Sequence, residues 1–448
     1  MILPSFSLTA LSGADDFLAR LATRAAPGPQ GAEGAPLVED TVAAILADVR
    51  QRGLEAVLEY TRRFDAPSFS ETLFALPEDA PARAASAIPR EDAAVIAEAA
   101  ANIRRFHEGQ KEQSWFLPRP DGSILGQMVL PVDRAGLYVP GGKGGETPLI
   151  SSLLMNAIPA QVAGVRELAV ISPPRNDGSL NPHILAAAHL LGITEIYAAG
   201  SAWAIAALAY GAGPLKPVDV IAGPGNIFVA TAKRLLIGAV GIDMIAGPSE
   251  VCIVADATAQ PAWIAADMLS QAEHDSLASA VCIVIDQDDS GDMVRRIAAE
   301  LERQVQSLPR REIALESLAR YSAVISVPGV ELAVELANRI APEHLELLVA
   351  DPWELLPQVR HAGAVFMGHY SAEPLGDYFA GPNHVLPTMG TARFSSALSV
   401  HTFCKKTSVI AASPAFARAG AEPVARLARL EGLEAHARSA LIRLEAKE

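Results

Sequence analysis

From Leu137 onward, the sequence repeats one pattern: a short apolar run, a turn that often contains glycine, and then a helix-length segment. In the first series the helix-length segments include His183–Leu191 and Ala202–Tyr210. Strands that alternate with helices in this way predict a parallel sheet with helices on both faces. A second series starts at Glu250, so we expect two similar α/β units. The apolar runs are 168–172, 195–199 and 218–222, then 251–255, 281–285, 323–327 and 363–366.

Segments of a different character flank these two series. Residues 6–24 predict a strand followed by a helix, and residues 25–34, rich in Pro, Gly and Ala, predict a linker. Residues 38–64 and 90–113 have the apolar periodicity of amphipathic helices. Residues 414–444 are almost wholly helical in pattern, which suggests a tail that docks elsewhere, for example in a partner subunit.

The predicted fold is therefore α/β, with two similar doubly wound, incomplete Rossmann-like domains between an N-terminal arm and a helical C-terminal arm. We expect the first domain to be discontinuous and to carry the metal and acid/base candidates, and the second to contact a cofactor. The expected boundaries are 1–36 for the N-terminal arm, 37–128 with 249–390 for the first domain, 129–248 for the second domain, and 391–448 for a C-terminal dimerisation arm.

Composition excludes several classes of protein. The formal charge is 36 − 51 = −15, and an acidic surface repels phosphate backbones, so nucleic acid is a poor candidate partner. No uncharged, unbroken apolar stretch reaches about 20 residues, and the N-terminus lacks the pattern of a signal peptide, so neither a membrane span nor secretion is expected. Cys252 and Cys282 sit in apolar runs and predict core residues, while the odd total of three cysteines fits a reducing compartment such as the cytoplasm.

Two clusters offer ligands for a metal ion. Gln271 and His274 are three residues apart at the end of a predicted helix, so both side chains can project from one face, although an ordinary polar helix end is an alternative. Asp377, a candidate metal ligand, and His384, a candidate substrate contact, lie among turn-forming residues, where loops often carry function but where a plain surface turn is also common. His436 in the tail is, taken alone, more typical of a surface residue.

A third cluster, residues 341–346, offers acid/base chemistry. Pro342 ends a predicted helix, so the adjacent Glu343 and His344 are expected on an irregular turn that can expose both, and a solvated turn without function is the alternative. A glycine turn at Gly223–Asn226 follows a strand and opens a helix, so its amides could meet a phosphate. The usual G-x-G-x-x-G fingerprint is missing, and the turn alone is a weak sign of a dinucleotide.

Taken together, these segments resemble the histidinol dehydrogenase family, and their order and intervals match from about residue 45 to residue 444. The resemblance implies an enzyme that oxidises L-histidinol to L-histidine, the last step of histidine biosynthesis, with two NAD⁺ and a bound aldehyde intermediate. The matching stretches are 138–142, 154–160, 223–226, 246–250, 270–274, 342–346 and 383–387.

The resemblance also implies residue roles. It implies that one Zn²⁺ per subunit is bound in a homodimer with shared active sites, with the last ligand and the substrate contact Glu431 coming from the other subunit. His344 would be the general base and Glu343 would activate water. The implied zinc ligands are Gln271, His274, Asp377 and His436; the implied substrate contacts are Ser249, Gln271, His274, His344, Asp377, His384, Glu431 and His436; the implied NAD contacts are Tyr138, Asn226 and position 203.

Position 203 departs from the pattern, because the family often has Gln where this chain has Trp203, and an indole cannot accept a hydrogen bond. Three other functions stay open at this point. The chain could be a related zinc and NAD dehydrogenase for another primary alcohol, a zinc hydrolase, or a metal-binding module without catalysis.

Overall fold

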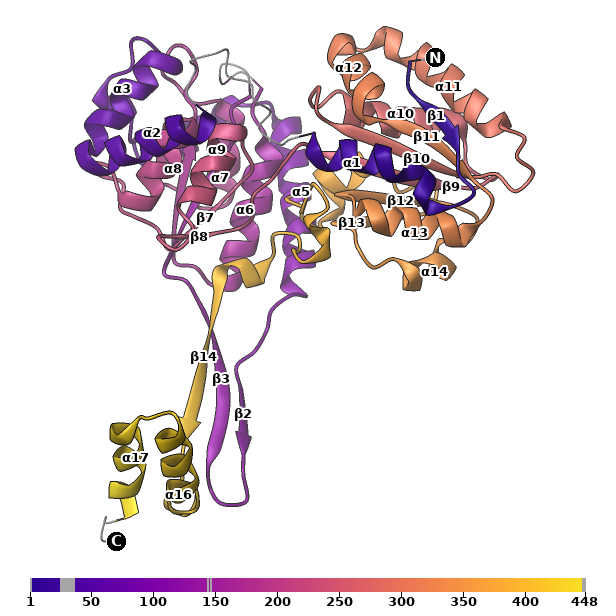
Figure 1. Cartoon of the computed structure of the whole chain (residues 1–448). Coiled ribbons are helices and arrows are strands. Elements are labelled where there is room, and N and C mark those ends of the chain that lie inside the picture. Colours follow the sequence, from indigo (N-terminus) through magenta and orange to yellow (C-terminus); the bar gives the residue numbers. More distant parts are fainter. Residues whose placement is uncertain (1, 25–36, 143–144, 146, 445–448) are drawn as a thin grey trace.

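The computed structural model describes residues 2–24, 37–142, 145 and 147–444. Two sheet-and-helix units stand side by side, and a long stalk projects away from them and ends in two helices (Figure 1). Residues 25–36 of the predicted N-terminal arm lie outside the described residues. The prediction of an α/β fold is confirmed, because both units contain parallel strands connected by helices.

The first unit is built on a six-stranded parallel sheet with the order β1-β11-β10-β9-β12-β13, counted over the described residues. Its central strands are almost wholly buried, which explains why each contains one of the apolar runs seen in the sequence. The strands are β1 (Ser5–Ser7), β9 (Glu250–Ala255), β10 (Ser279–Ile285), β11 (Ala323–Val327), β12 (His344–Leu348) and β13 (Ala364–Met367); the helices are α1 (Asp15–Thr23), α10 (Pro261–Ala272), α11 (Asp292–Gln304), α12 (Arg311–Tyr321), α13 (Val330–Ile340), α14 (Pro352–Leu355) and α15 (Glu373–Leu375).

The second unit has a five-stranded parallel sheet with the order β6-β5-β4-β7-β8. When β1 is set aside, this order is the same as that of the first sheet, with β4 corresponding to β9 and β7 to β12. In both sheets the order in which successive strands are added therefore reverses beside the first strand, β9 or β4, as it does in doubly wound folds. The strands are β4 (Arg134–Tyr138), β5 (Glu167–Ser172), β6 (Ile196–Ala198), β7 (Val220–Ala222) and β8 (Gly241–Ile242); the helices are α6 (Ile150–Ala163), α7 (Pro182–Leu190), α8 (Ser201–Tyr210) and α9 (Ile227–Leu235).

The structure corrects two of the expected boundaries. The helices of residues 38–108 were expected with the first unit, but their apolar faces share one buried core with the second sheet. Helix periodicity shows which face is buried and not which sheet covers it, so the sequence could not decide this. Residues 5–7 of the expected N-terminal arm form β1, which adds to the edge of the first sheet beside β11. The helices concerned are α2 (Val38–Arg52), α3 (Leu54–Phe64), α4 (Ala80–Ala87) and α5 (Arg90–Glu108).

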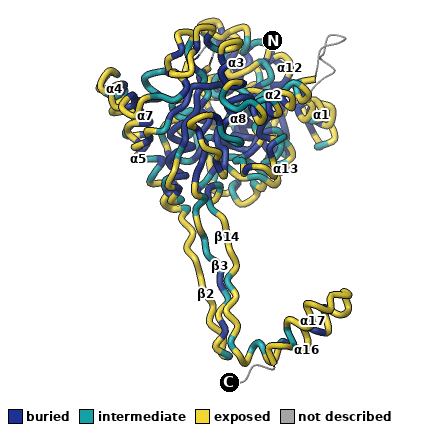
Figure 2. The backbone as a smooth tube through the Cα atoms, turned by 90° about the vertical axis from the view of Figure 1, so that its left-hand side faces the viewer, coloured by how far each residue is buried: buried dark blue, intermediate teal, exposed yellow. Residues whose placement is uncertain are grey.

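The stalk is a three-stranded antiparallel sheet with the order β14-β3-β2. β14 (Cys404–Ala411) pairs along its whole length with β3 (Ile124–Pro131), and β2 (Trp115–Pro118) covers the other edge of β3. The predicted C-terminal arm thus contains two short 3-10 helices (Thr391–Arg393 and Val400–Phe403) and the strand β14 before the two expected helices, α16 (Pro414–Leu430) and α17 (Glu434–Leu441). Most residues of the stalk and tail are exposed (Figure 2).

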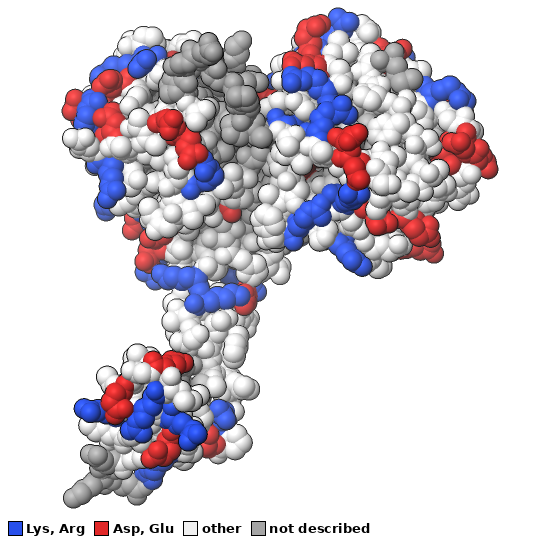
Figure 3. Space-filling view, in the orientation of Figure 1, with Lys and Arg blue, Asp and Glu red and all other residues white. Residues whose placement is uncertain are grey.

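Within the described residues, no helix is both long enough and apolar enough to cross a membrane. On the face shown in Figure 3, positive and negative side chains alternate over both units and over the tail.

Candidate active site

His344 is the first residue of β12 and the centre of the candidate site. It pairs with Val251 of β9 on one side and with Ala364 of β13 on the other, so two neighbouring strands fix its backbone. Its side chain is buried, with Nδ1 3.2 Å from the carbonyl oxygen of Glu250 and Nε2 3.4 Å from Oδ1 of Asp377. When Nδ1 carries the proton, its N–H donates a hydrogen bond to that carbonyl. Nε2 is then the basic nitrogen of the neutral ring.

Glu343 lies directly before this strand and is also buried. Its Oε2 accepts the N–H of Glu250 at 2.9 Å and lies 3.7 Å from Nδ1 of His344. Ala341 adopts a left-handed conformation, with φ of 52°, and ends α13, so the chain enters β12 after only two further residues. The expected solvent-exposed turn is therefore wrong: Glu343 and His344 are held inside the protein.

Asp377 approaches His344 from the opposite side. It lies in a π-helical turn, Gly376–Ala380, directly after α15. The ring N–H at Nδ1 of His384 can donate to the carbonyl oxygen of Asp377 at 3.0 Å, which links the two predicted residues. Glu373, at the start of α15, accepts a hydrogen bond from Ser270 at 3.0 Å, and one donor atom each from Glu373, Asp377 and His344 lies within 4.8 Å of the others.

Gln271 and the exposed His274 lie at and just beyond the end of α10, whose Ser270 contacts Glu373 of the cluster. The helix ends at Ala272, earlier than predicted, and His274 follows on a turn in which its N–H donates to the carbonyl of Gln271 at 3.2 Å. Gln271 is fully buried, yet among the described residues neither its Oε1 nor its Nε2 has a hydrogen-bond partner. Leaving a buried polar group unpaired costs about 1–3 kcal/mol, so this amide is poised for a ligand.

The donor set fits a divalent cation. Amide oxygen, imidazole nitrogen and carboxylate oxygen are all ligands that Zn²⁺ accepts, and the absence of thiolate is typical of a catalytic rather than a structural site. Gln271, His274 and Asp377 would hold such an ion from one chain. A fourth donor is needed for a tetrahedral shell, and Glu373 is a further carboxylate within reach of Asp377.

The electrostatics of the cluster are those of a functional site. Burial by itself would lower the pKa of His344, but the carboxylates of Glu343 and Asp377 outweigh burial and raise this pKa to about 10. Burial raises the pKa of Glu343 to about 7 and that of Glu373 also to about 7. For Asp377, burial is outweighed by the nearby His344, and its pKa is lowered.

Two further acids belong to this region and were missed in the sequence. Burial raises the pKa of Glu373, as noted, and that of Glu346, which lies two residues after His344 on the same face of β12. Oε1 of Glu346 accepts the N–H of Glu373 at 3.0 Å and so ties β12 to α15. The only sequence signal was a glutamate inside an apolar strand, where an acid is costly unless it is paired or protonated.

A second group of predicted residues lies in the other unit. Tyr138 ends β4 and Gly223 follows β7, so both lie where the strand order reverses, at the carboxyl edge of the five-stranded sheet. This edge is where open α/β sheets bind ligands. The hydroxyl of Tyr138 accepts the N–H of Ser201 at 3.2 Å, and Oδ1 of Asn226 caps α9 by accepting the N–H groups of Phe228 and Val229.

Trp203, predicted to contact the cofactor, lies in the first turn of α8. Its side chain is buried, its Nε1 donates to Oγ1 of Thr61 at 3.1 Å, and its ring stacks on Tyr60 and Phe64. Because α3 packs on α8, the indole fills a core between these helices. The departure from the family pattern at this position is thus accommodated by packing.

The remaining predicted residues divide between the site and the tail. Ser249 is half-buried directly before β9, next to Glu250, and its carbonyl accepts the N–H of Ser279. Glu431 and His436 are exposed on the tail, which the stalk holds away from both sheets of the same chain (Figure 1). One chain therefore does not bring these two residues to the cluster.

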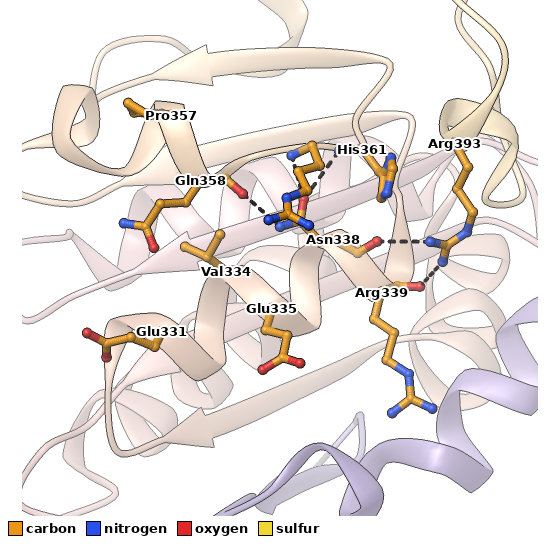
Figure 4. A pocket seen from close by; sticks show the side chains of 10 residues that line it. Glu331, Val334, Glu335, Asn338, Arg339, Pro357, Gln358, His361 and Arg393 are labelled. Carbon is orange, nitrogen blue, oxygen red and sulfur yellow. Dashed lines mark hydrogen bonds between the residues drawn. The ribbon is translucent and has the colours of Figure 1, made fainter.

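An open groove of about 560 Å³ lies elsewhere, beside α13 (Figure 4). Three arginines line it, but Arg393 donates to the carbonyl oxygens of Asn338 and Arg339, and Arg339 pairs with Asp15 at 2.7 Å. Two of the three guanidinium groups in the groove are therefore already bound to other groups of the protein. The groove contains none of the predicted site residues, and the buried cluster around His344 is the better candidate for chemistry.

Comparisons with known proteins identify the family of this chain. Residues 30–444 match the family model described as histidinol dehydrogenase. The chain is 65% identical to the histidinol dehydrogenase of Nitratidesulfovibrio vulgaris over 91% of this chain and 92% of that protein, and 53% identical to that of Geobacillus kaustophilus over 90% and 92%. The crystal structure of histidinol dehydrogenase from Elizabethkingia anophelis superposes with a TM-score of 0.89 at 32% identity, covering 99% of this chain and 98% of that one.

Proposed function

The chain belongs to the histidinol dehydrogenase family, and on that premise we propose that it oxidises L-histidinol to L-histidine in two steps, with NAD⁺ and one Zn²⁺ per subunit. The observation that carries this proposal is the contact of the buried pair Glu343–His344 with Asp377, next to the end of α10 where Gln271 and His274 lie. A base, a water-activating acid and three cation ligands are what a four-electron oxidation of an amino alcohol needs in one place.

His344 is suited to act as the base in the first step. With Nδ1 donating to the carbonyl of Glu250, Nε2 can accept the hydroxyl proton while the adjacent carbon loses a hydride. The raised pKa of His344 would keep it protonated, but a cation neutralises the charge of Asp377 and so favours the neutral ring. When bound, NAD⁺ supplies the hydride acceptor, and Zn²⁺ fixes the substrate's imidazole and amine as a template.

Glu343 is suited to the second step. Burial raises its pKa to about 7, so the carboxylate can take a proton from water near neutral pH. Water activated in this way would add to the aldehyde, and the resulting hydrate can then lose the second hydride. Because the pair Glu343–His344 lies inside the protein, the reactive aldehyde is kept from bulk solvent between the steps.

The tail is proposed to complete the site of a second copy of the chain. Glu431 and His436 are held far from the cluster of their own chain, whereas a twofold partner could present them to it. The stalk and tail also carry exposed apolar side chains that a partner would cover: Trp115, Phe116, Leu117, Ile410, Leu427 and Leu430. A homodimer explains both features.

The free cysteines fit a reducing compartment, and we propose the cytoplasm as the location.

The decisive experiment counts NADH. Purified protein is given a limiting amount of L-histidinol with excess NAD⁺, before and after treatment with a chelator and after Zn²⁺ is restored. We expect two NADH per histidinol, loss of turnover with the chelator and recovery with Zn²⁺. One NADH per substrate, or turnover that ignores the chelator, would contradict the mechanism. Faster NADH formation with another primary alcohol would favour a related dehydrogenase, and amide cleavage without NADH would favour a zinc hydrolase.

A further inference from the structure

A buried ion pair lies directly beneath the glycine turn Gly223–Asn226. Lys233 of α9 and Asp243, which follows β8, contact each other through Nζ and Oδ1, and their side chains are 2% and 0% exposed. Nζ of Lys233 donates to the carbonyl oxygen of Gly223 at 2.9 Å, while Oδ2 of Asp243 accepts the N–H of Gly223 at 2.8 Å. Both backbone polar groups of one glycine are thus held by the same ion pair.

Gly223 is a position where such a clamp has consequences. Its φ of +127° is open to glycine and costly for other residues, and a Cβ added there would lie 2.0 Å from the carbonyl oxygen of Tyr138. The turn is therefore pressed against the end of β4. It leads within three residues to Asn226, whose side chain caps α9, so the clamp also sets the position of that helix's first amides.

A lysine shortly after a glycine turn suggests a phosphate ligand, but the surroundings of Lys233 argue against that role. Its ammonium is buried, neutralised by Asp243 and hydrogen-bonded to a backbone carbonyl, so it presents no free charge to a ligand. Its position favours an action on the backbone instead.

We propose that Lys233 and Asp243 are positioning residues that hold the turn Gly223–Asn226 in the conformation that binds the pyrophosphate side of NAD⁺. This inference rests on the proposed use of NAD⁺. A preformed turn spares the cofactor the cost of ordering it, so the pair should act on cofactor affinity rather than on substrate affinity.

The test compares Lys233→Met, Asp243→Asn and the double variant with the unchanged chain. Dissociation constants for NAD⁺ and for L-histidinol are measured separately by calorimetry on the zinc-loaded protein. We expect each variant to weaken NAD⁺ binding about tenfold or more, with histidinol affinity changed less than about twofold. Asp243→Asn is the discriminating variant. If Lys233 bound phosphate directly, removing the neighbouring negative charge would tighten NAD⁺ binding, and that result would overturn the proposal.

Single variants strand a buried charge and can fail to fold, whereas the double variant removes both charges. NAD⁺ affinity unchanged in a folded double variant would also overturn the proposal. The matched control is the exposed pair between Arg234, also on α9, and Glu39 of α2, which are 2.6 Å apart. Replacing them by Met and Gln should leave both affinities unchanged.

A second readout needs no nucleotide. Hydrogen exchange of the amides of Gly223, Gly225 and Asn226 should become about tenfold faster in the double variant and stay unchanged in the control. If the unchanged chain binds no NAD⁺, the proposed function fails, and the exchange rates still decide whether the ion pair holds the turn. Equal exchange in the double variant and the unchanged chain would refute the positioning role.

Discussion

Arg24 and Glu250 form a buried ion pair, with Nη2 2.6 Å from Oε2, although 226 positions separate them in the chain. Glu250 opens β9, its N–H is bound by Glu343, and its carbonyl faces Nδ1 of His344. The N-terminal segment thereby supports the two residues proposed to carry the chemistry. Its edge strand β1 and its last described residue, Arg24, are both part of the first unit.

Replacing Arg24 with Met should destabilise the protein strongly, because Glu250 would remain buried without its partner. Loss of one member of a buried pair typically costs about 3–5 kcal/mol, whereas an exposed pair contributes about 0–1 kcal/mol. Urea unfolding measures the difference. The matched control is Arg339→Met, which breaks the exposed pair with Asp15. Equal losses in the two variants would show that Glu250 does not depend on Arg24.

The variant His344→Asn should lower kcat about 10²–10⁴-fold, because the hydroxyl proton loses its acceptor at Nε2. The KM for histidinol should change little, since the proposed cation, and not His344, holds most of the substrate. Steady-state kinetics with histidinol and NAD⁺ measure both values. His401→Asn, at an exposed position, serves as the control. Full turnover in His344→Asn would assign the base to another residue.

Replacing Gln271 with Met should have opposite effects on two measured quantities. Without metal, the free energy of unfolding should rise by about 1–3 kcal/mol, because the variant removes a fully buried amide that has no hydrogen-bond partner. Zinc affinity should fall, because a ligand is lost. Urea unfolding with a chelator and zinc titration by calorimetry measure the two effects. A variant with unchanged zinc affinity would exclude Gln271 from the metal site.

The raised pKa of Asp65 predicts that the stability of the folded chain depends on pH. Burial raises its pKa to about 7, against the opposing hydrogen bond from the N–H of Gly200. Because the pKa is higher in the folded chain than its unfolded value of about 3.9, this residue favours folding below that value, and the advantage is lost as the pH rises through about 7. Asp65→Asn should therefore stabilise the protein at pH 8 by about 1–3 kcal/mol and have little effect at pH 4.

Unfolding free energies of Asp65→Asn and the unchanged chain at a series of pH values test this difference. Asp288→Asn, at an exposed position, is the control and should give a curve parallel to that of the unchanged chain. A parallel curve for Asp65→Asn as well would show that the carboxyl of Asp65 does not titrate as described.

Sharing of the site between subunits predicts complementation. His344→Asn and His436→Ala should each be nearly inactive alone. In a mixed dimer, one site would combine the intact body of the second chain with the intact tail of the first. Random reassortment of equal amounts should then restore about a quarter of full activity. No recovery after verified subunit exchange would place His436 outside the partner's site.

The parts of the fold that depend on local pattern were predictable. Buried parallel strands such as β9 and β10 contain the apolar runs seen in the sequence, and α2 and α3 lie within the expected helical stretch of residues 38–64. Which sheet the helices of residues 38–108 cover was not predictable, since an apolar helix face fits either one. The strand β14 was missed for a related reason: its residues are mostly exposed and lack a buried face.

The candidate site also contains residues that could be predicted from the sequence and residues that could not. Gln271, His274, Glu343, His344 and Asp377 were expected from motifs. The structure places Glu343 and Asp377 beside His344, and His274 close enough to Asp377 and His344 to interact with them electrostatically. The burial of Glu343 and His344 was not expected, because the register of β12 with β9 and β13 depends on residues far away in the chain. Glu346 and Glu373 were missed, since an isolated acid in an apolar strand or at a helix start has no distinguishing pattern.

The pairing of β3 with β14 has a practical consequence for making shortened forms of this protein. β3 lies between β2 and β14, so ending the chain before residue 404 would uncover a row of unpaired backbone groups along an eight-residue strand. An open edge of this kind recruits strands from other molecules. Shortened chains should therefore aggregate, and a soluble monomer is better sought by replacing apolar side chains on the tail than by removing it.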